Sequence, residues 1–194
     1  MSPMPDFSLS ATGPLGRAAR AMRIGTFMDL ASHVRSLPYG RLRSPDLPHA
    51  VLVEGKGTCS SKHRLLAASA HEADHTEIEL VVGIYMMSEL NTPGVGAVIG
   101  NGVIPEAHCY LRIDGLRADF TGLPVADESP FDALVSEVVV DPASLPERKL
   151  LIHKAALSKW ATVAGISSEE AWKLRELCIA RLAANNSPDR SDSR

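Results

Sequence analysis

The order of apolar and polar residues predicts two helices in the first part of the chain. In residues 18–37, apolar side chains recur at a period near 3.6, the spacing of an amphipathic helix, and Pro38 ends the pattern. Residues 62–73 repeat that period. Thr58 is a suitable N-cap for this second helix, and in that position it places Cys59 in the first helical turn.

The middle of the chain has the pattern of extended strands. Residues 77–87 form a nearly continuous apolar run, which is typical of a buried strand. Residues 107–120 predict a β-hairpin, because alternating segments flank Asp114-Gly115, a strong two-residue turn. The remaining predicted elements are short strands at residues 50–53 and 135–140 and helices at residues 145–163 and 167–184, the last one opened by a Ser-Ser-Glu-Glu capping box.

These elements predict an α+β fold. We expect a mostly antiparallel sheet of three to five strands, with the Cys59 helix packed on it and a C-terminal helical pair as cover. Residues 1–16 and 186–194 are expected to be disordered tails, which leaves a single domain over residues 17–185. Residues 88–105, rich in Gly, Asn and Pro, predict a long loop that shapes or gates a site.

Composition and charge narrow the class of protein. The 194 residues carry a formal net charge of −3 and show no basic stripe with interleaved aromatic residues, so we expect no nucleic-acid partner. We also expect no membrane partner, because no apolar run approaches the roughly 20 residues of a membrane span. Three cysteines are too few for a disulfide framework and odd in number. Together with the lack of a signal-peptide pattern, this favours reduced thiols and a cytoplasmic location.

Cys59 is the first candidate for chemistry. A thiol attacks a carbonyl carbon as the thiolate, and the unpaired N–H groups and dipole of a helix N-terminus stabilise that anion. The same N–H groups can hold the oxyanion of a tetrahedral intermediate. A small buried cysteine with only a packing role fits this position equally well, so the active-site interpretation needs a base nearby.

The predicted hairpin supplies that base and a partner for it. With Asp114-Gly115 as a two-residue turn, Tyr110 pairs with Asp119, and Asp119 becomes the diagonal neighbour of His108 on one face, about 7–8 Å away at the backbone. The other face is entirely apolar, which supports this register, since a one-residue slip would mix the two faces. A His beside an Asp suits a base and its orienting group, although an ordinary cross-strand polar pair has the same spacing.

A Cys at a helix start, a His on a strand and an Asp on the next strand resemble the transglutaminase-like branch of the papain-like fold. The strings that carry the resemblance are Gly-Thr-Cys-Ser-Ser-Lys-His at 57–63, Glu-Ala-His-Cys-Tyr-Leu at 106–111 and Arg-Ala-Asp-Phe-Thr at 117–121. Three further strings, at residues 37–41, 91–94 and 104–108, resemble small bacterial members of this superfamily. The resemblance covers roughly residues 25–185.

The resemblance implies a thiol hydrolase or acyltransferase that works through an acyl-enzyme without a cofactor. Cys59 is then the nucleophile, His108 the general base and acid, and Asp119 the group that orients His108. The implied substrate is a peptide, a small amide or a thioester, and the oligomeric state stays open. Side chains expected to line the substrate site are Tyr39, Thr58, Ser60, Asn91, Glu106 and Tyr110.

One departure from the family pattern favours a second interpretation. Many relatives place a Gln or Trp upstream of the Cys to complete the oxyanion hole. This chain contains no Gln, and both of its tryptophans, Trp160 and Trp172, lie downstream. A catalytically weak or inactive relative that uses the cleft as a binding module is therefore the alternative function.

Two other histidine patterns compete with this interpretation. His71-Glu-Ala-Asp-His75 matches the H-E-x-x-H helix of zinc proteases, so a zinc-dependent hydrolase through His71 and His75 is a third possibility. We expect the helix to end within this string, which would destroy the i,i+4 geometry, and so we predict no metal site. His63 lies one turn after Cys59 and is expected to be a packing residue rather than the base.

Overall fold

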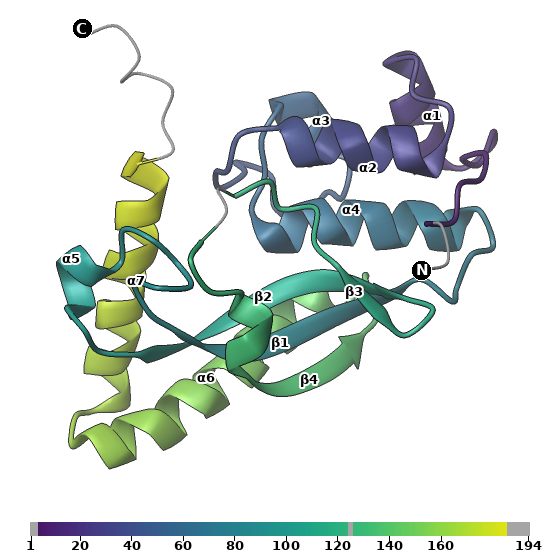
Figure 1. Ribbon diagram of the computed structural model, residues 1–194. Helices are drawn as coiled ribbons and strands as arrows, with labels where there is room; N and C mark the ends of the chain where they lie inside the picture. The colour runs from purple at the N-terminus through teal and green to yellow at the C-terminus, as the bar shows by residue number, and fades with distance from the viewer. Residues whose placement is uncertain (1–3, 124–125, 186–194) are drawn as a thin grey trace, which may run out of the picture. The chain divides into compact units, whose positions relative to one another are not determined.

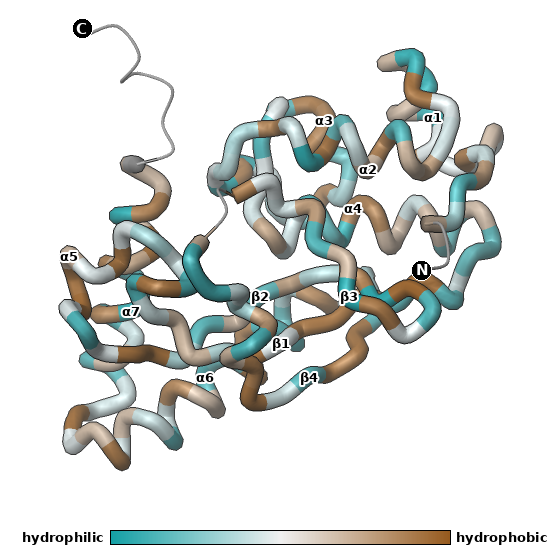
Figure 2. Tube along the Cα trace, viewed as in Figure 1, coloured by the Kyte–Doolittle hydropathy of each residue, from teal (hydrophilic) through white to brown (hydrophobic). Residues whose placement is uncertain are grey.

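The computed structural model describes residues 4–123 and 126–185, which adopt an α+β fold (Figure 1). Its strands form a four-stranded antiparallel sheet in the order β3-β2-β1-β4. The strands are β1 (Glu79–Met87), β2 (Ile104–Ile113), β3 (Leu116–Ala118) and β4 (Leu134–Val140). Figure 2 shows the apolar character of β1, which was predicted as a buried strand. The expected fold class is confirmed at this level.

Helices precede, separate and follow the strands. They are α1 (Pro14–Ala21), α2 (Phe27–Ser36), α3 (Ala50–Glu54), α4 (Cys59–Glu72), α5 (Gly96–Ile99), the short 3₁₀ helix η1 (Pro130–Ala133), α6 (Leu145–Ala164) and α7 (Ser168–Asn185). Within the described ranges, none of these helices combines the length and apolarity needed to cross a membrane.

The chain divides into two compact units. Within the described residues, unit 1 comprises 4–82, 109–123 and 138–146, and unit 2 comprises 83–108, 126–137 and 147–185. Unit 1 therefore holds α1 to α4 and the hairpin turn, and unit 2 holds α5, η1, α7 and all but the first two residues of α6. The single domain expected over residues 17–185 stays a prediction.

Helix α4 is the centre of unit 1. It contacts α1, α2 and α3, which lie on one side of it in Figure 1. Its buried residues include Leu65, Leu66 and Ala70, each with no exposed surface. At its N-terminus, Thr58 accepts a hydrogen bond from the Ser61 N–H, and the Ser61 hydroxyl accepts one from the Thr58 N–H, which completes a capping box. The predicted N-cap and helix start are confirmed.

The β2–β3 hairpin has the predicted register. Ile113 pairs with Leu116, Arg112 with Arg117, and Leu111 with Ala118. Asp114 and Gly115 both have positive φ, 50° and 76°, as a type I′ turn requires. The ladder ends at Ala118, so Asp119 lies one residue beyond β3 instead of within it.

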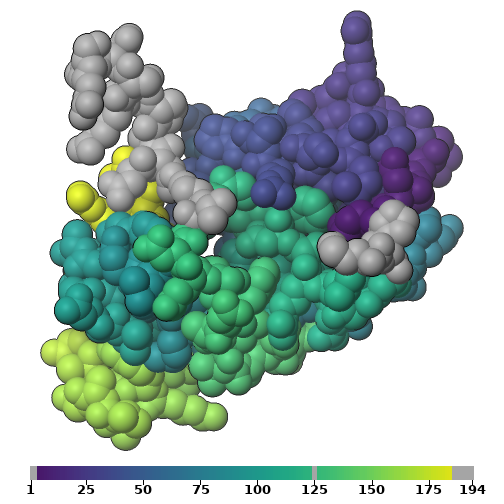
Figure 3. All heavy atoms as spheres, viewed as in Figure 1, coloured from purple at the N-terminus to yellow at the C-terminus, as the bar shows by residue number. Residues whose placement is uncertain are grey.

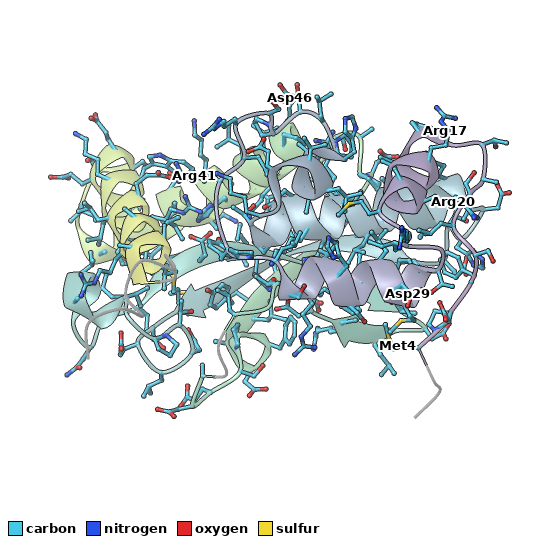
Figure 4. All side chains as sticks on the ribbon, turned by 90° about the horizontal axis from the view of Figure 1, so that it is seen from above. Met4, Arg17, Arg20, Asp29, Arg41 and Asp46 are labelled. Carbon is cyan, nitrogen blue, oxygen red and sulfur yellow. The ribbon has the colours of Figure 1, made fainter. Side chains whose placement is uncertain are left out.

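Residues 4–16, expected to belong to a disordered tail, are packed against the rest of unit 1. Leu9 is only 2% exposed, and its carbonyl accepts a hydrogen bond from Arg20 of α1, a residue labelled in Figure 4. The Glu72 carboxylate at the end of α4 accepts hydrogen bonds from the Leu15 and Gly16 N–H groups. The composition of this segment does not reveal these contacts, because they depend on residues elsewhere in the sequence. Residues 1–3 and 186–194 lie outside the described residues.

The single helix predicted over residues 18–37 is two helices, α1 and α2, which form part of the surface shown in purple in Figure 3. Arg23 adopts a left-handed conformation with φ 64°, which ends the first helix, and Thr26 caps the second. The strand predicted at residues 50–53 is the short helix α3, terminated by Gly55 at φ 62°. A short apolar run does not distinguish helix from strand.

Unit 2 is built around the C-terminal helices. Its apolar core consists of Tyr85, Met87, Val95, Ile104, Leu157, Ala161, Ala171, Cys178, Ile179 and Leu182. The predicted capping box is present: Glu170 accepts from the Ser167 N–H, and its own N–H donates to the Ser167 hydroxyl. The loop expected at residues 88–105 contains the short helix α5 and ends where β2 begins.

Candidate active site

Cys59 is the first residue of α4, as the sequence predicts. The backbone N–H groups of this first turn have no acceptor within the helix, so the turn carries partial positive charge. The Cys59 side chain is almost buried, and its Sγ lies 3.8 Å from the hydroxyl of Ser60. The position combines a thiol with a helix N-terminus, and the partial positive charge of that terminus favours the thiolate.

The segment before Cys59 is fixed by the chain around Tyr39. Tyr39 forms a parallel β-bridge with Gly57; the Gly57 N–H donates to the Pro38 carbonyl, and the Gly40 N–H donates to the Gly57 carbonyl. A Cβ on Gly57 would lie 2.9 Å from Cγ of Lys62 and from Oγ of Ser61. The predicted proximity of Tyr39 to the nucleophile turn is therefore present at the level of the backbone.

His63 uses both ring nitrogens to connect α4 to the segment after β3. Its Nε2 accepts a hydrogen bond from the Phe120 N–H at 2.7 Å, so that nitrogen carries the lone pair. Its Nδ1 then carries the proton and donates to the Cys59 carbonyl at 2.8 Å. A fully buried imidazole with both ring nitrogens hydrogen-bonded to the backbone is consistent with the packing residue expected at this position.

Asp119 lies beside this connection. Its Oδ1 accepts hydrogen bonds from the Thr121 N–H at 2.7 Å and from the Thr121 hydroxyl at 2.5 Å. The same oxygen lies 3.5 Å from Nε2 of His63. The carboxylate is one third exposed and is fixed in orientation by the Asx-type turn that it forms. Cys59 and Asp119 thus belong to one compact unit, with His63 between the Cys59 backbone and the Asp119 carboxylate.

Lys62 is a functional candidate that no motif in the sequence indicates. Its side chain is completely buried, and its ammonium donates to the Leu37 carbonyl at 2.6 Å and the Thr121 carbonyl at 2.7 Å. Burial lowers the pKa of Lys62 to about 8, while the charges of Asp119 and of the Cys59 thiolate act to raise it. The signal was available in the helical period, since position 62 lies on the same buried face as Leu66 and Ala70.

The electrostatic interaction between Lys62 and Cys59 is mutual. A thiolate that favours the ammonium is itself favoured by that ammonium, because the same Coulomb energy stabilises both charged forms. Both groups are shielded from solvent, where screening by salt is weak. The first turn of α4 therefore presents the Cys59 sulfur with two sources of positive potential, the helix terminus and Lys62.

His108, the predicted base, belongs to unit 2, whereas Cys59 and Asp119 belong to unit 1. The His108 side chain is 9% exposed. Within unit 2, its ring centroid lies 6.2 Å from that of Tyr85, in an edge-on arrangement, and 6.2 Å from that of Phe131. The triad as a set of three residues stays a prediction.

Several side chains expected to line the substrate site are engaged inside the protein. Asn91 donates to the Met86 carbonyl and accepts from the Ser88 N–H, which holds the turn after β1. Glu106 receives two hydrogen bonds from Arg175, at 2.6 and 2.7 Å. Thr58 serves as the N-cap and Tyr110 is completely buried, whereas Ser60 contacts the Cys59 sulfur directly.

The zinc-protease pattern does not form a metal site. Helix α4 ends at Glu72, so His71 and His75 do not share a helical face. Nε2 of His71 binds the Ile78 carbonyl at 3.0 Å, and Nδ1 of His75 binds the Glu77 carboxylate at 2.7 Å. Among residues 4–123 and 126–185, no three potential His, Cys, Asp or Glu ligands gather closely enough to hold a metal ion.

Comparisons with known proteins add no relative: no family model matches the chain, and neither curated proteins nor solved structures give a significant match.

Proposed function

We propose that the chain is a thiol-dependent hydrolase or acyltransferase of transglutaminase-like fold that acts on an amide or thioester bond. The observation that carries the proposal is Cys59 at the first position of the capped helix α4, three residues before the buried Lys62. A helix start alone is a weak indicator of a reactive cysteine. The charge of the buried Lys62, which interacts electrostatically with Cys59, favours a reactive thiolate over a cysteine with only a packing role.

The proposed reaction begins with attack of the Cys59 thiolate on the carbonyl carbon. His108, taken as the base by its place in the sequence pattern, accepts the thiol proton and later donates it to the leaving group. Asp119 orients His108 in this scheme, and its carboxylate is already held by Thr121. Water or an amine then attacks the acyl-enzyme and regenerates the thiolate.

The oxyanion of the intermediate needs hydrogen-bond donors, and the chain has no Gln to supply one. We assign this role to backbone N–H groups in the first turn of α4, which point along the helix axis toward its N-terminus. The Lys62 charge adds to the positive potential in this turn. A reducing location such as the cytoplasm, proposed from the cysteine content, would keep the nucleophile as a thiol.

Trapping the acyl-enzyme tests this proposal. The purified chain is mixed with an acetyl thioester and quenched in acid, and the mass of the peptide spanning residues 57–62 is measured. We expect acetylation of Cys59 in the wild type and in Cys178→Ser, and loss of at least about 100-fold in rate in His108→Ala. Cys178 is the matched control because it is a buried thiol of α7 that lies in the apolar core of unit 2.

Two outcomes would contradict the proposed enzyme activity. Acetylation of Cys178 at the same rate as Cys59 would mean that the label reports general thiol chemistry. No acetylation of Cys59 by a panel of thioesters and activated amides would instead favour the inactive binding relative.

A further inference from the structure

Two cysteine sulfurs contact the same hydroxyl group in unit 1. Sγ of Cys59 lies 3.8 Å from Oγ of Ser60, and the Cys109 thiol donates to that same oxygen at 3.6 Å. Cys59 and Ser60 are the first two residues of α4, whereas Cys109 lies in β2. Two thiols from separate elements therefore meet around one side chain, although 50 residues of sequence separate them.

The elements that carry the two thiols are well anchored. The capping box of Thr58 and Ser61 fixes the first turn of α4. The β2–β3 ladder begins two residues after Cys109, at Leu111. Both sulfurs are buried, Cys109 completely and Cys59 at 6% exposure. The sulfurs are thus held near one another by the fold, and reaction between them needs no encounter between chains.

The two thiols differ in their surroundings. Cys59 lies at the helix N-terminus and interacts with the Lys62 charge, which favours its thiolate, the form that hydroperoxides oxidise. Cys109 lies within a strand and has no exposed surface, which suits a thiol that reacts only with an oxidised neighbour.

We propose that Cys59 and Cys109 form a reversible oxidation site, in which a hydroperoxide oxidises Cys59 and Cys109 resolves it to an intramolecular disulfide. The Cys59 thiolate attacks the peroxide oxygen, breaks the O–O bond and becomes a sulfenic acid, while the peroxide leaves as water or an alcohol. The Cys109 thiol then attacks the Cys59 sulfur and expels water. Two thiols are oxidised in total and one peroxide is reduced.

Cys178 provides an internal comparison. It lies in unit 2 within α7, and burial together with the nearby Glu106 raises its pKa, so it forms the reactive thiolate less readily than an ordinary thiol. Peroxide should therefore oxidise Cys59 faster than Cys178 in the same molecule.

The proposal is tested on the full chain with hydrogen peroxide alone. Remaining thiols are alkylated after unfolding, and peptides are identified by mass without reduction. We expect a Cys59–Cys109 cross-link, a mass loss of about 2 Da in the monomer that dithiothreitol reverses, and Cys178 that stays alkylated. Oxidation of Cys59 to sulfinic acid while Cys109 remains a thiol would overturn the proposal. So would a disulfide between two chains, or unmodified Cys59 under conditions that oxidise Cys178.

Two variants separate resolution from general oxidation. Cys109→Ser should abolish the cross-link and increase irreversible oxidation of Cys59 roughly tenfold, because no thiol remains to capture the sulfenic acid. Cys178→Ser is the matched control and should form the cross-link like the wild type. The readout is covalent, so a chain that forms the disulfide but never an acyl-enzyme would support this site and refute the proposed enzyme activity.

Discussion

Nε2 of His63 accepts a hydrogen bond from the backbone N–H of Phe120 at 2.7 Å, which ties helix α4 to the segment that carries Asp119. The same ring donates through Nδ1 to the Cys59 carbonyl. One buried imidazole thus connects the backbone of the proposed nucleophile to the backbone beside the proposed orienting carboxylate. We therefore expect His63 to stabilise unit 1 through these two hydrogen bonds, which alanine in the same helix cannot make.

Replacing His63 with alanine should destabilise the protein by about 3 kcal/mol, because a buried donor and a buried acceptor lose their partner and a cavity remains. The free energy of unfolding in urea measures this effect. His33→Ala on α2 is the control: its Nε2 is buried and makes no hydrogen bond within the described chain, so the loss should stay near 1 kcal/mol. Equal losses in both variants would contradict the connecting role of His63.

Lys62 should make stability depend on alkaline pH. Its pKa is about 8 in the folded state against the ordinary 10.5 of a lysine, so between these values the unfolded chain binds more protons and stability rises with pH. The gain should approach about 3 kcal/mol over that interval in the wild type relative to Lys62→Met. Unfolding measured at pH 7, 9 and 10.5 tests this. Lys159→Met, on the exposed surface of α6, should follow the wild-type curve.

Gly122 should tolerate no side chain. It has φ +74°, and a Cβ would lie 2.0 Å from the Arg35 carbonyl oxygen at the end of α2. Gly122→Ala should therefore cost at least about 3 kcal/mol or prevent folding. Gly165→Ala is the matched control, since φ is +72° with open space around the added carbon, and about 1 kcal/mol is expected. Thermal unfolding distinguishes the two, and similar midpoints would disprove the close approach.

The buried ion pair of unit 2 should matter far more than a surface pair. Glu106→Ala leaves Arg175 buried without its bidentate partner and should cost about 3–5 kcal/mol. Glu169→Ala removes an exposed pair with Lys173, at 2.8 Å, and should cost less than about 0.5 kcal/mol. Chemical denaturation of the two variants provides the comparison; a small loss for Glu106→Ala would show that the pair is dispensable.

Local signals in the sequence were sufficient for elements with strong caps and turns. Thr58 and Ser167 identified two helix starts, and Asp114-Gly115 identified a hairpin with its register. The apolar period does not reveal the break between α1 and α2, because it continues across residues 22–26, where Arg23 adopts a left-handed φ and Thr26 caps the next helix.

The interior of the candidate site was harder to predict because it depends on long-range contacts. The partners of Lys62 are the Leu37 and Thr121 carbonyls, at sequence distances that no local pattern reports. The same holds for the contact of Cys109 with Ser60. Motif spacing therefore indicates which residue types could react, but not the carbonyl partners of Lys62 or the contact of the second thiol with Ser60.

The pH dependence of Cys59 alkylation by iodoacetamide decides whether His108 activates a Cys59 thiolate, as proposed. We expect a wild-type rate that reaches its plateau well below pH 8.5, the ordinary range of a thiol, and a His108→Ala profile displaced upward by about one pH unit or more. Circular dichroism confirms that the variant is folded. A wild-type rate that still rises through pH 8.5, or identical profiles for the two proteins, would contradict it.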